Sequence, residues 1–427
     1  MLLLCLGTDV AANPPADYAA NSCLSTGKWV KIQVSETGIY KLTNADLQKM
    51  GFSDPGKVSV HGYGGWPLAE DFSQPYMDDL PATAVWRTAD GLLFYARGPI
   101  QWSYNATDGA FEHTNNPYAT AGYYFITDST EPKEMETVSN VEGATLTVRQ
   151  FDDYQLHEKE LVSLNESGRQ LFGESFDSNL SQSFAFSMPG ITNEEGKVTL
   201  RFVAKATSGN GTVSLSIGDQ RILNGTIRNS SKSDNYTKAI AYSGIGTWTG
   251  EKSESFRTQV QYSTTGHENV RLDYIRVQAQ RTLKPYGACT FFRSIASIGN
   301  VTRFILQEAT AQTKVWDVTD PVEPKLMDAQ LNGSELSFVI PAGALREFAV
   351  VQSDQSFPTP TTIGSVENQD LHALPQTDFV IIAPKAFLTA AETLAQAHRD
   401  RDGLSVQVVQ PEQIYNEFSS GTPDATA

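Results

Sequence analysis

The sequence predicts a mainly β protein: several β-sandwich or immunoglobulin-like modules, followed by the first β-α-β unit of an α/β domain. Two observations support this prediction. Short segments of alternating hydrophobic residues, separated by turns rich in Gly, Pro, Asn and Asp, run from residue 27 to about residue 351. Residues 378–408 instead give a continuous hydrophobic segment, a helical pattern and a second hydrophobic segment.

Length and composition are those of a folded protein and exclude some partners. The 427 residues are enough for about three domains with buried cores. Hydrophobic residues make up 40% and charged residues 19%, which is too hydrophobic for a disordered chain. The net charge of −17 argues against nucleic acid as a partner and disfavours an anionic membrane surface. After the amino terminus no segment approaches the ~20 hydrophobic residues of a membrane span, so the mature protein is predicted not to be transmembrane.

Residues 1–12 are interpreted as the remnant of a signal peptide. Met1–Leu6 reads as the end of a hydrophobic segment, and Val10-Ala11-Ala12 is a suitable signal-peptidase site, although the usual basic residues are missing. A frayed hydrophobic terminus is the alternative. A lipoprotein motif at Leu2-Leu3-Leu4-Cys5 lacks the basic stretch that should precede it. The leader interpretation predicts an exported protein.

Residues 27–149 form the predicted amino-terminal β domain. Alternation predicts strands at 29–34, 57–60, 92–96 and 123–127. Residues 44–50 predict one helical turn with Asn44 as its N-cap. Aromatic residues concentrate here and could form a platform for stacking sugars or peptides, but filling a small β core is the simpler interpretation. They include Trp66, Trp86, Trp102, Tyr118, Tyr123 and Tyr124.

Residues 150–283 are predicted to form an antiparallel β-sandwich of the jelly-roll type, because their strands are longer, alternate clearly and have no helices between them. The alternating positions are Val198, Leu200 and Phe202, then Val213, Leu215 and Ile217, then Val270, Leu272 and Tyr274. Residues 284–366 add a smaller, immunoglobulin-like module and a connector that begins at 358–360. Strands of this module are expected at 302–307, 313–318, 335–340 and 347–351.

Residues 367–427 begin an α/β domain. The hydrophobic run 378–383 is typical of a strand buried on both faces of a parallel sheet, and a second strand is expected at 404–408. Between them Gly403 ends a predicted helix. The hydrophobic stripe of that helix is Phe387, Ala390, Ala391, Leu394 and Ala397.

The last residues predict another helix, with Thr422 as N-cap and Pro423 at its first position. Because the sequence stops at Ala427, inside the first turn of that helix, we expect the domain to be truncated. We also expect the first strand and helix of the unit to be better ordered than residues 415–427.

Histidines and acidic pairs form no recognisable site. The six histidines have no second His or Cys at a metal-binding spacing; they are His61, His113, His157, His267, His372 and His398. The segment 61–65 (His-Gly-Tyr-Gly-Gly) is similar to an oxyanion-hole glycine loop, but without a Gly-x-Ser-x-Gly elbow a glycine turn after a strand is simpler. The pairs 78–79 and 152–153, both Asp-Asp, could be halves of calcium sites, although solvated turns are more common.

The three cysteines supply neither a disulfide framework nor an activated nucleophile. Cys5 falls in the leader, and a disulfide between Cys23 and Cys289 would satisfy the count without support from the sequence. Neither Cys23 nor Cys289 lies in a strand-to-helix turn that would lower the pKa of its thiol. No catalytic, cofactor-binding or metal-binding residue is therefore assigned in this sequence, and no cofactor is expected.

Several short motifs, in one order along nearly the whole chain, resemble those of a single family. They are residues 27–32, 37–42, 116–118, 123–125, 272–275, 315–319, 368–372, 378–382 and 414–421. Each motif is weak alone. Together they resemble the gingipain-like cysteine peptidases, and most closely the sortases of the type IX secretion system of Bacteroidetes.

The resemblance implies a caspase- or gingipain-like α/β domain that begins near residue 367, with its catalytic His and Cys on later strands, after Ala427. It implies that the full-length protein cleaves carboxy-terminal sorting domains from exported proteins at the outer membrane, and could transfer the products to a surface glycolipid. Protein substrates and secretion-machinery components would be its partners, and residues 1–427 would be inactive alone. His372 and His398 do not match the family's catalytic histidine; His398 is expected to be a semi-exposed helical residue. The alternative is a non-enzymatic β-sandwich protein for adhesion or carbohydrate binding.

Overall fold

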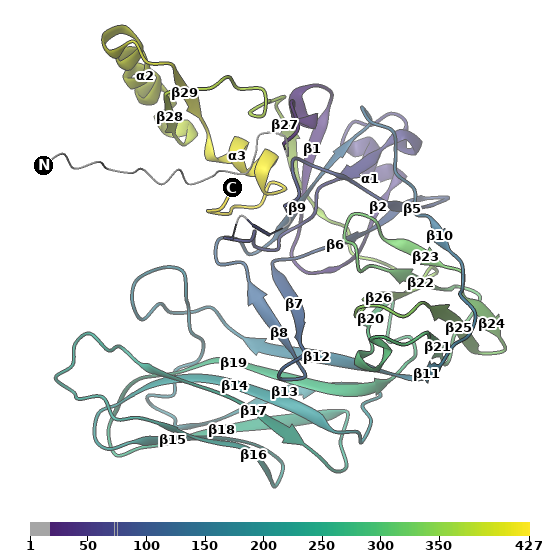
Figure 1. The fold of residues 1–427 in the computed structure, drawn as a ribbon, viewed down its shortest axis with the longest axis vertical. Helices are drawn as coiled ribbons and strands as arrows, with labels where there is room; N and C mark the ends of the chain where they lie inside the picture. The colour runs from purple at the N-terminus through teal and green to yellow at the C-terminus, as the bar shows by residue number, and fades with distance from the viewer. Residues whose placement is uncertain (1–17, 72, 75) are drawn as a thin grey trace, which may run out of the picture.

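The computed structural model describes residues 18–71, 73–74 and 76–427, and β-strands dominate in these residues (Figure 1). The expected leader and Cys5 lie outside the described residues. The described α-helices are α1 (Asn44–Lys49), α2 (Leu388–Asp402) and α3 (Pro411–Phe418). Short 3-10 helices are η2 (Cys23–Ser25), η3 (Pro55–Lys57), η4 (Ile295–Ser297) and η5 (Lys385–Phe387). The predicted mainly β class is confirmed.

Two sheets pack face to face in the amino-terminal part. The first has the order β27 (Thr361–Val366), β1 (Trp29–Val34), β9 (Gly122–Thr127), β3 (Ser59–His61) and β4 (Ala82–Thr83). The second has the order β2 (Gly38–Thr43), β6 (Gly91–Ala96) and β5 (Val85–Thr88). Ile32, Phe94 and Tyr124 are among the buried side chains between them. Thr43, rather than Asn44, is the N-cap of α1, because its side chain forms a capping box with Asp46.

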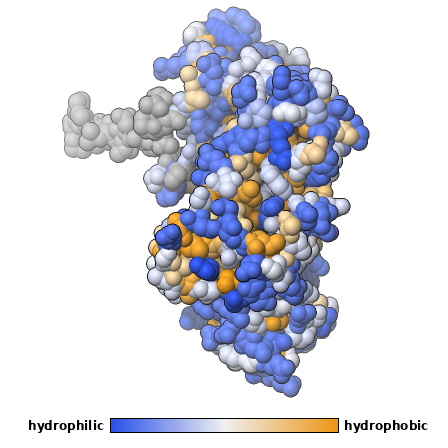
Figure 2. Space-filling model, turned by 90° about the vertical axis from the view of Figure 1, so that its right-hand side faces the viewer, coloured by the Kyte–Doolittle hydropathy of each residue, from blue (hydrophilic) through white to orange (hydrophobic). Residues whose placement is uncertain are grey.

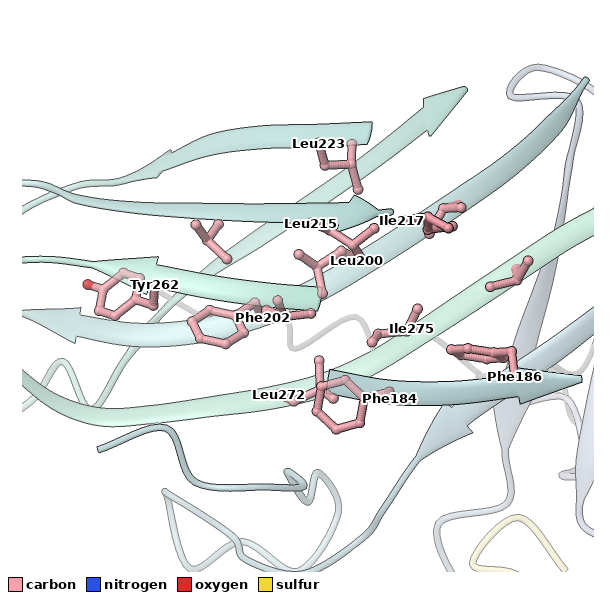
Figure 3. Close-up of a cluster of buried hydrophobic side chains, with 14 of the residues drawn as sticks. Phe184, Phe186, Leu200, Phe202, Leu215, Ile217, Leu223, Tyr262, Leu272 and Ile275 are labelled. Carbon is pink, nitrogen blue, oxygen red and sulfur yellow. The ribbon is translucent and has the colours of Figure 1, made fainter. Parts of the chain in front are cut away.

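The predicted antiparallel sandwich is formed by two four-stranded sheets. One has the order β12 (Gln150–Glu158), β19 (His267–Thr282), β14 (Gly196–Ala206) and β17 (Ile240–Trp248). The other has the order β13 (Ser181–Ser187), β18 (Ser255–Ser263), β15 (Gly211–Ile217) and β16 (Gln220–Ile227). Figure 3 shows Leu200 and Phe202 of β14 pointing into the space between the sheets, where they meet Tyr262 of β18. The alternation seen in the sequence is therefore the core-facing side of each strand.

A second sandwich contains the strands expected between residues 284 and 366. One sheet has the order β10 (Thr137–Val138), β23 (Lys325–Met327), β22 (Thr313–Asp317), β26 (Phe348–Gln352) and β20 (Cys289–Phe292). The other has the order β11 (Leu146–Val148), β21 (Thr302–Leu306), β25 (Glu335–Ile340) and β24 (Gln330–Asn332). Their common core includes Phe292, Phe304 and Phe348.

Three strands pair across the module boundaries expected from the sequence. β10 and β11 precede residue 150, yet they pair in parallel with β23 and β21. β27 lies in the expected connector, but it pairs antiparallel with β1. Each of these strands covers a sheet edge that would otherwise have unpaired backbone groups. The division of the chain into modules at 149/150, 283/284 and 366/367 stays a proposal. In it, β10 and β11 pair with strands of the third module, and β27 pairs with a strand of the first.

The amino-terminal sheets and the second sandwich share a hydrophobic contact. Leu93 and Tyr95 of β6 pack in one cluster with Trp316 of β22 and Val351 of β26. β6 is therefore buried on both faces, which explains why all its residues are buried. A separate hairpin, β7 (Ile100–Asn105) and β8 (Ala110–Asn115), lies between these parts and the β12–β19 sheet (Figure 1).

The β-α-β unit is present, but its burial differs from the prediction. β28 (Phe379–Ile382) and β29 (Val406–Val409) pair in parallel, α2 connects them, and Gly403 ends α2 with φ +68°. The hydrophobic run typical of a strand buried on both faces is largely uncovered in the described residues: Val380 is 50% and Ile382 59% exposed. Of the predicted helical stripe only Ala391 is buried. The other buried residue of α2 is Ala395, which was not part of the predicted stripe. Within the described residues, a two-stranded sheet and one helix offer too few neighbours to cover these faces.

The final segment also differs from the prediction. Its helix is α3, which begins at Pro411 with Gln410 as N-cap, and no helix begins at Thr422 in the described residues. Thr422 is instead 1% exposed and its hydroxyl donates to the carbonyl of Gly64. Among the described residues, no helix combines the length and hydrophobicity that crossing a membrane requires.

Candidate functional site

Residues 416–424 are buried against the amino-terminal sheet that contains β1, β9 and β3. Asn416, Glu417, Ser419, Ser420, Thr422 and Asp424 are all less than 9% exposed. Their polar groups face protein partners rather than solvent, so the contact depends on specific hydrogen bonds. Residues 416–424 are thus more buried than β28 and α2, and we treat this docked segment as the candidate site; the expected difference in order between the two parts stays a prediction.

His372 lies between two carboxylates that come from distant parts of the chain. Its Nδ1 is 2.6 Å from Glu417 Oε2 and its Nε2 is 3.0 Å from Asp78 Oδ1. The His372 side chain is 1% exposed, and its ring stacks on Phe418 with 4.7 Å between centroids. Burial alone lowers the pKa of His372, but the hydrogen bonds to Asp78 and Glu417 outweigh burial and raise it. A protonated His372 therefore connects the loop before β4, the start of the C-terminal unit and α3.

Glu417 is the most enclosed member of this cluster. Its side chain is fully buried and also accepts hydrogen bonds from the backbone N–H groups of Leu371 and His372 and from Gln369 Nε2. A buried carboxylate is tolerated only when it is paired and hydrogen-bonded, and here both conditions hold. The segment 369–372 is thereby fixed onto α3.

Lys31 of β1 provides a second polar contact. Its Nζ donates to Asn416 Oδ1 at 2.9 Å and to the carbonyl of Gly421 at 2.7 Å. The same ammonium lies 4.5 Å from the centroid of the Tyr123 ring. Burial lowers the pKa of Lys31 to about 8, against the opposing effect of Glu412. Lys31 therefore binds both the helical and the extended part of the docked segment.

The glycine loop after β3 binds Ser420. The Ser420 hydroxyl accepts from the backbone N–H of Tyr63 at 2.9 Å and of Gly64 at 3.4 Å, and donates to the carbonyl of Tyr123 at 3.0 Å. Gly62 has φ +112°, and a Cβ there would lie 2.5 Å from the Ser420 hydroxyl. The two adjacent N–H groups resemble an oxyanion hole, but the protein's own serine occupies them. The loop is the glycine turn expected from the sequence, and its backbone N–H groups form a binding site for the Ser420 hydroxyl, which we call the socket.

Two further contacts complete the docking. The Asp424 carboxylate accepts from the backbone N–H of Leu68 at 2.9 Å. The carbonyl of Phe418 accepts from the hydroxyls of Tyr63 at 3.2 Å and Tyr76 at 2.8 Å. The contact therefore involves residues from Tyr63 to Leu68, and also Tyr76, of the loop that follows β3.

No described cysteine could act as the nucleophile of this site. Cys23 and Cys289 are both free, so the disulfide between them, left open by the sequence, is excluded. Burial, reinforced by Asp79, raises the pKa of the Cys23 thiol well above its usual value. Burial also raises the pKa of Cys289 to about 12, with a further contribution from Glu347. Because the reactive species is the thiolate, both thiols are poor nucleophiles.

The acidic pairs are neither solvated turns nor halves of calcium sites. Asp79 accepts from the Ser22 hydroxyl and the Cys23 backbone N–H at the start of η2. Asp152 accepts from the backbone N–H of Ile295, and Asp153 forms a 2.6 Å ion pair with Arg281. Within the described residues, no group of three or more His, Cys, Asp or Glu side chains could hold a metal ion.

The other five histidines also have hydrogen-bond partners, none of them shared with the docked segment. The pairs are His61 with the Leu80 carbonyl and Thr130, His113 with Glu158, His157 with Glu174, His267 with the Asp177 carbonyl, and His398 with Asp402. His398 is a half-buried residue of α2, as predicted. The role of His372 was missed, because a contact between residues 294 positions apart leaves no local signal.

Comparison with known proteins places the docked segment in a family. Peptidase family C25 matches residues 372–427. The crystal structure of dimeric latent PorU from Porphyromonas gingivalis matches with a TM-score of 0.89 and 34% sequence identity, over 96% of this chain. This chain is similar to PorU along nearly all of its length, and its residues 372–427 match peptidase family C25. It spans 39% of the PorU chain that it matches.

Two carbohydrate-binding modules match far more weakly. A CBM6 module of LamC from Zobellia galactanivorans covers 22% of this chain and 70% of its own, with 12% identity and a TM-score of 0.15. A family 35 carbohydrate-binding module from Clostridium thermocellum covers 30% and 90%, with 9% identity and a TM-score of 0.18. Scores at this level support no conclusion. No curated protein matches the sequence.

The C25 match divides the docking contact of this PorU-like protein in two. His372, Glu417 and Ser420 lie inside the match, whereas Lys31 and Asp78 lie in the region that precedes it. The contact therefore joins the start of the peptidase-family segment to the upstream β-sheet.

Proposed function

We propose that this chain is the non-catalytic amino-terminal part of a secreted gingipain-like cysteine peptidase, most similar to a type IX secretion sortase. In full length the protein would cleave carboxy-terminal sorting domains from exported proteins at the cell surface or outer membrane. Its partners would be protein substrates and components of the secretion machinery. The observation that carries this proposal is the 34% identity with PorU over 96% of this chain.

The docking contact suggests what residues 1–427 contribute. Lys31, Asp78 and the glycine loop hold the start of the C25 segment by buried hydrogen bonds from the upstream sheet. Such a contact would orient a peptidase domain relative to the β modules. We assign no residue of this chain a catalytic role, since both described thiols have raised pKa values.

A cleavage assay tests the proposal. The substrate is a fluorescent protein that ends in a carboxy-terminal sorting domain, and the two enzymes are residues 1–427 and a chain that continues through a complete C25 domain. Cleavage by the longer chain alone, abolished by iodoacetamide, is the expected result. Thiol-sensitive cleavage by residues 1–427 would contradict the assignment. A folded longer chain without any such cleavage would favour the non-enzymatic adhesion alternative.

A further inference from the structure

A cavity of about 720 Å³ lies where the amino-terminal sheets, the β12–β19 sheet and the β20 sheet meet. Its walls come from the β1–β2 turn, the β7–β8 hairpin, the start of β12 and the edge strand β20. The size is within the range of small-molecule and oligosaccharide sites, roughly 300–1,000 Å³. Figure 2 shows one face of the molecule, on which hydrophobic residues gather at mid-height between two mostly hydrophilic ends. The cavity does not include any residue of the C25 match.

Aromatic rings form one wall of this cavity. Trp102 and Tyr104 line it from the same face of β7, because alternate residues of a strand point to one side. Trp102 stacks on Tyr154 of β12 with 3.9 Å between ring centroids. Trp66 also lines the cavity and is only half-buried. The interpretation that these aromatic residues fill a core is thus wrong for Trp66 and Trp102, whereas it holds for the fully buried Tyr124.

Apart from Glu36 in the β1–β2 turn, the charged groups of the wall are paired. Arg281 pairs with Asp153 at 2.6 Å, and Arg293 forms a two-pronged pair with Glu347. Arg346 pairs with Asp317 at 3.2 Å just outside the cavity. An acidic ligand would therefore find no uncompensated cation among these groups, and its desolvation would not be offset.

Neutral hydrogen-bonding groups remain available. The Nε1–H of Trp66 has no hydrogen-bond partner among the described residues; it is buried, so a ligand reaches it only if the Trp66 ring turns. The hydroxyl groups of Ser35 and Ser103 also line the cavity, whereas those of Thr37, Thr290 and Thr319 already accept from backbone N–H groups. These groups can donate to and accept from a ligand rich in hydroxyls.

We propose that this cavity binds a neutral oligosaccharide. The apolar face of a pyranose ring can stack on Trp102 or Trp66, while its hydroxyl groups bond to the neutral donors and acceptors of the wall. The aromatic rings of β7 favour ring-shaped ligands, whereas the edge strand β20 of the same wall offers a backbone on which an extended peptide can pair, so a peptide is included among the probes. The compensated ion pairs favour a neutral sugar over an acidic one. This proposal does not depend on the proposed peptidase function.

Isothermal titration of residues 1–427 tests the proposal. The probes are cellotetraose, maltotetraose, mannotetraose and chitotetraose, with polygalacturonate fragments and a neutral pentapeptide as competitors of other classes. Saturable binding of at least one neutral tetrasaccharide is expected. The Trp102→Ala substitution should weaken this binding by about tenfold, and Trp66→Phe, which keeps a ring but removes the N–H group, by a few-fold. Tyr236→Ala, at a residue that is 96% exposed and outside the cavity, is the matched control and should change nothing.

Loss of folding must be separated from loss of the site. Circular dichroism and thermal unfolding are measured for each variant. If Trp102→Ala does not fold, the affinities of Trp66→Phe and Tyr104→Phe for the tetrasaccharide test the proposal instead. Absence of saturable binding to all four tetrasaccharides would overturn the proposal. Equal affinity in the parent chain, Trp102→Ala and Trp66→Phe would also overturn it, as would preferential binding of the acidic fragments or the peptide.

Discussion

The clearest lesson at the scale of single residues comes from His372. In the sequence it is one of six histidines without a metal-binding neighbour, and nothing nearby suggests a role. In the structure it is buried between Asp78 and Glu417, and its charge offsets that of Glu417 in a place without solvent. Its protonation state is therefore coupled to the docking of residues 411–424.

The stabilisation of this docking by His372 should be lost as the pH rises above neutrality, whereas Lys31, whose pKa is lowered to about 8, acts in the opposite direction at higher pH. The pKa of His372 is higher in the folded chain than its unfolded value of about 6.5, so its stabilising contribution is complete below about pH 6.5. The contribution is lost as the pH rises through the raised pKa. Each unit by which the pKa is raised corresponds to about 1.4 kcal/mol. Hydrogen exchange of residues 411–424 between pH 6 and 9, corrected for intrinsic rates, measures the effect.

The His372→Asn substitution should remove most of this pH dependence. His398→Asn is the control, because His398 pairs with Asp402 on α2, away from the docked segment. Constant protection across the pH range in the parent chain would show that His372 stays in one protonation state.

The two described cysteines should behave as unreactive thiols. Their pKa values are raised by burial, so little thiolate forms at pH 8. Mass spectrometry of the unreduced, native protein should find both thiols unmodified after brief exposure to iodoacetamide, and both alkylated after unfolding in urea. A Ser233→Cys variant gives an exposed control thiol. A mass two units lower before reduction, the mark of a disulfide, would contradict the structure.

At the scale of secondary-structure elements, the local hydrophobic pattern predicts where a strand lies in the sequence but not which strand it pairs with. Alternation placed β1, β9, β21 and β25 within a residue or two, because a half-buried strand repeats every two residues. The pairing of β27 with β1 was not predictable, since it joins segments more than 300 residues apart. The docked segment was missed for the same reason: its partners are Lys31, Asp78 and the glycine loop.

The socket formed by the loop after β3 should depend on one hydroxyl group. Ser420→Ala leaves two N–H groups and one carbonyl without their partner, at a cost of about 1–3 kcal/mol in the free energy of unfolding. Ser420 has φ +52°, so Ser420→Gly loses the same hydroxyl but relieves backbone strain of about 1 kcal/mol. Urea denaturation should therefore rank the parent chain first and Ser420→Gly above Ser420→Ala. Ser233→Ala, an exposed serine, is the control.

At the scale of the whole molecule, the C-terminal unit contacts the rest of the chain unevenly. Residues 416–424 are enclosed by the amino-terminal sheet, whereas β28 and α2 extend away from it (Figure 1). Hydrophobic periodicity correctly predicted the β-α-β unit, but it could not show which faces are covered, because coverage depends on neighbours distant in the sequence. Phe379 and Leu394 are hydrophobic yet exposed in the described structure, which marks a surface suited to further packing.

Hydrogen exchange should distinguish these two parts of the unit. In residues 1–427, amides of 411–424 should be more protected than those of β28 and α2, because their hydrogen bonds are buried beneath side chains of the amino-terminal sheet. In a chain that continues through a complete C25 domain, protection of residues 379–402 should rise sharply, since added strands and helices would cover Val380, Ile382 and Leu394. Protection of residues 411–424 should change little, because their partners are already present. Equal protection of β28 and α2 in both chains would mean that no further packing uses these faces, and would count against the proposed continuation of the α/β domain.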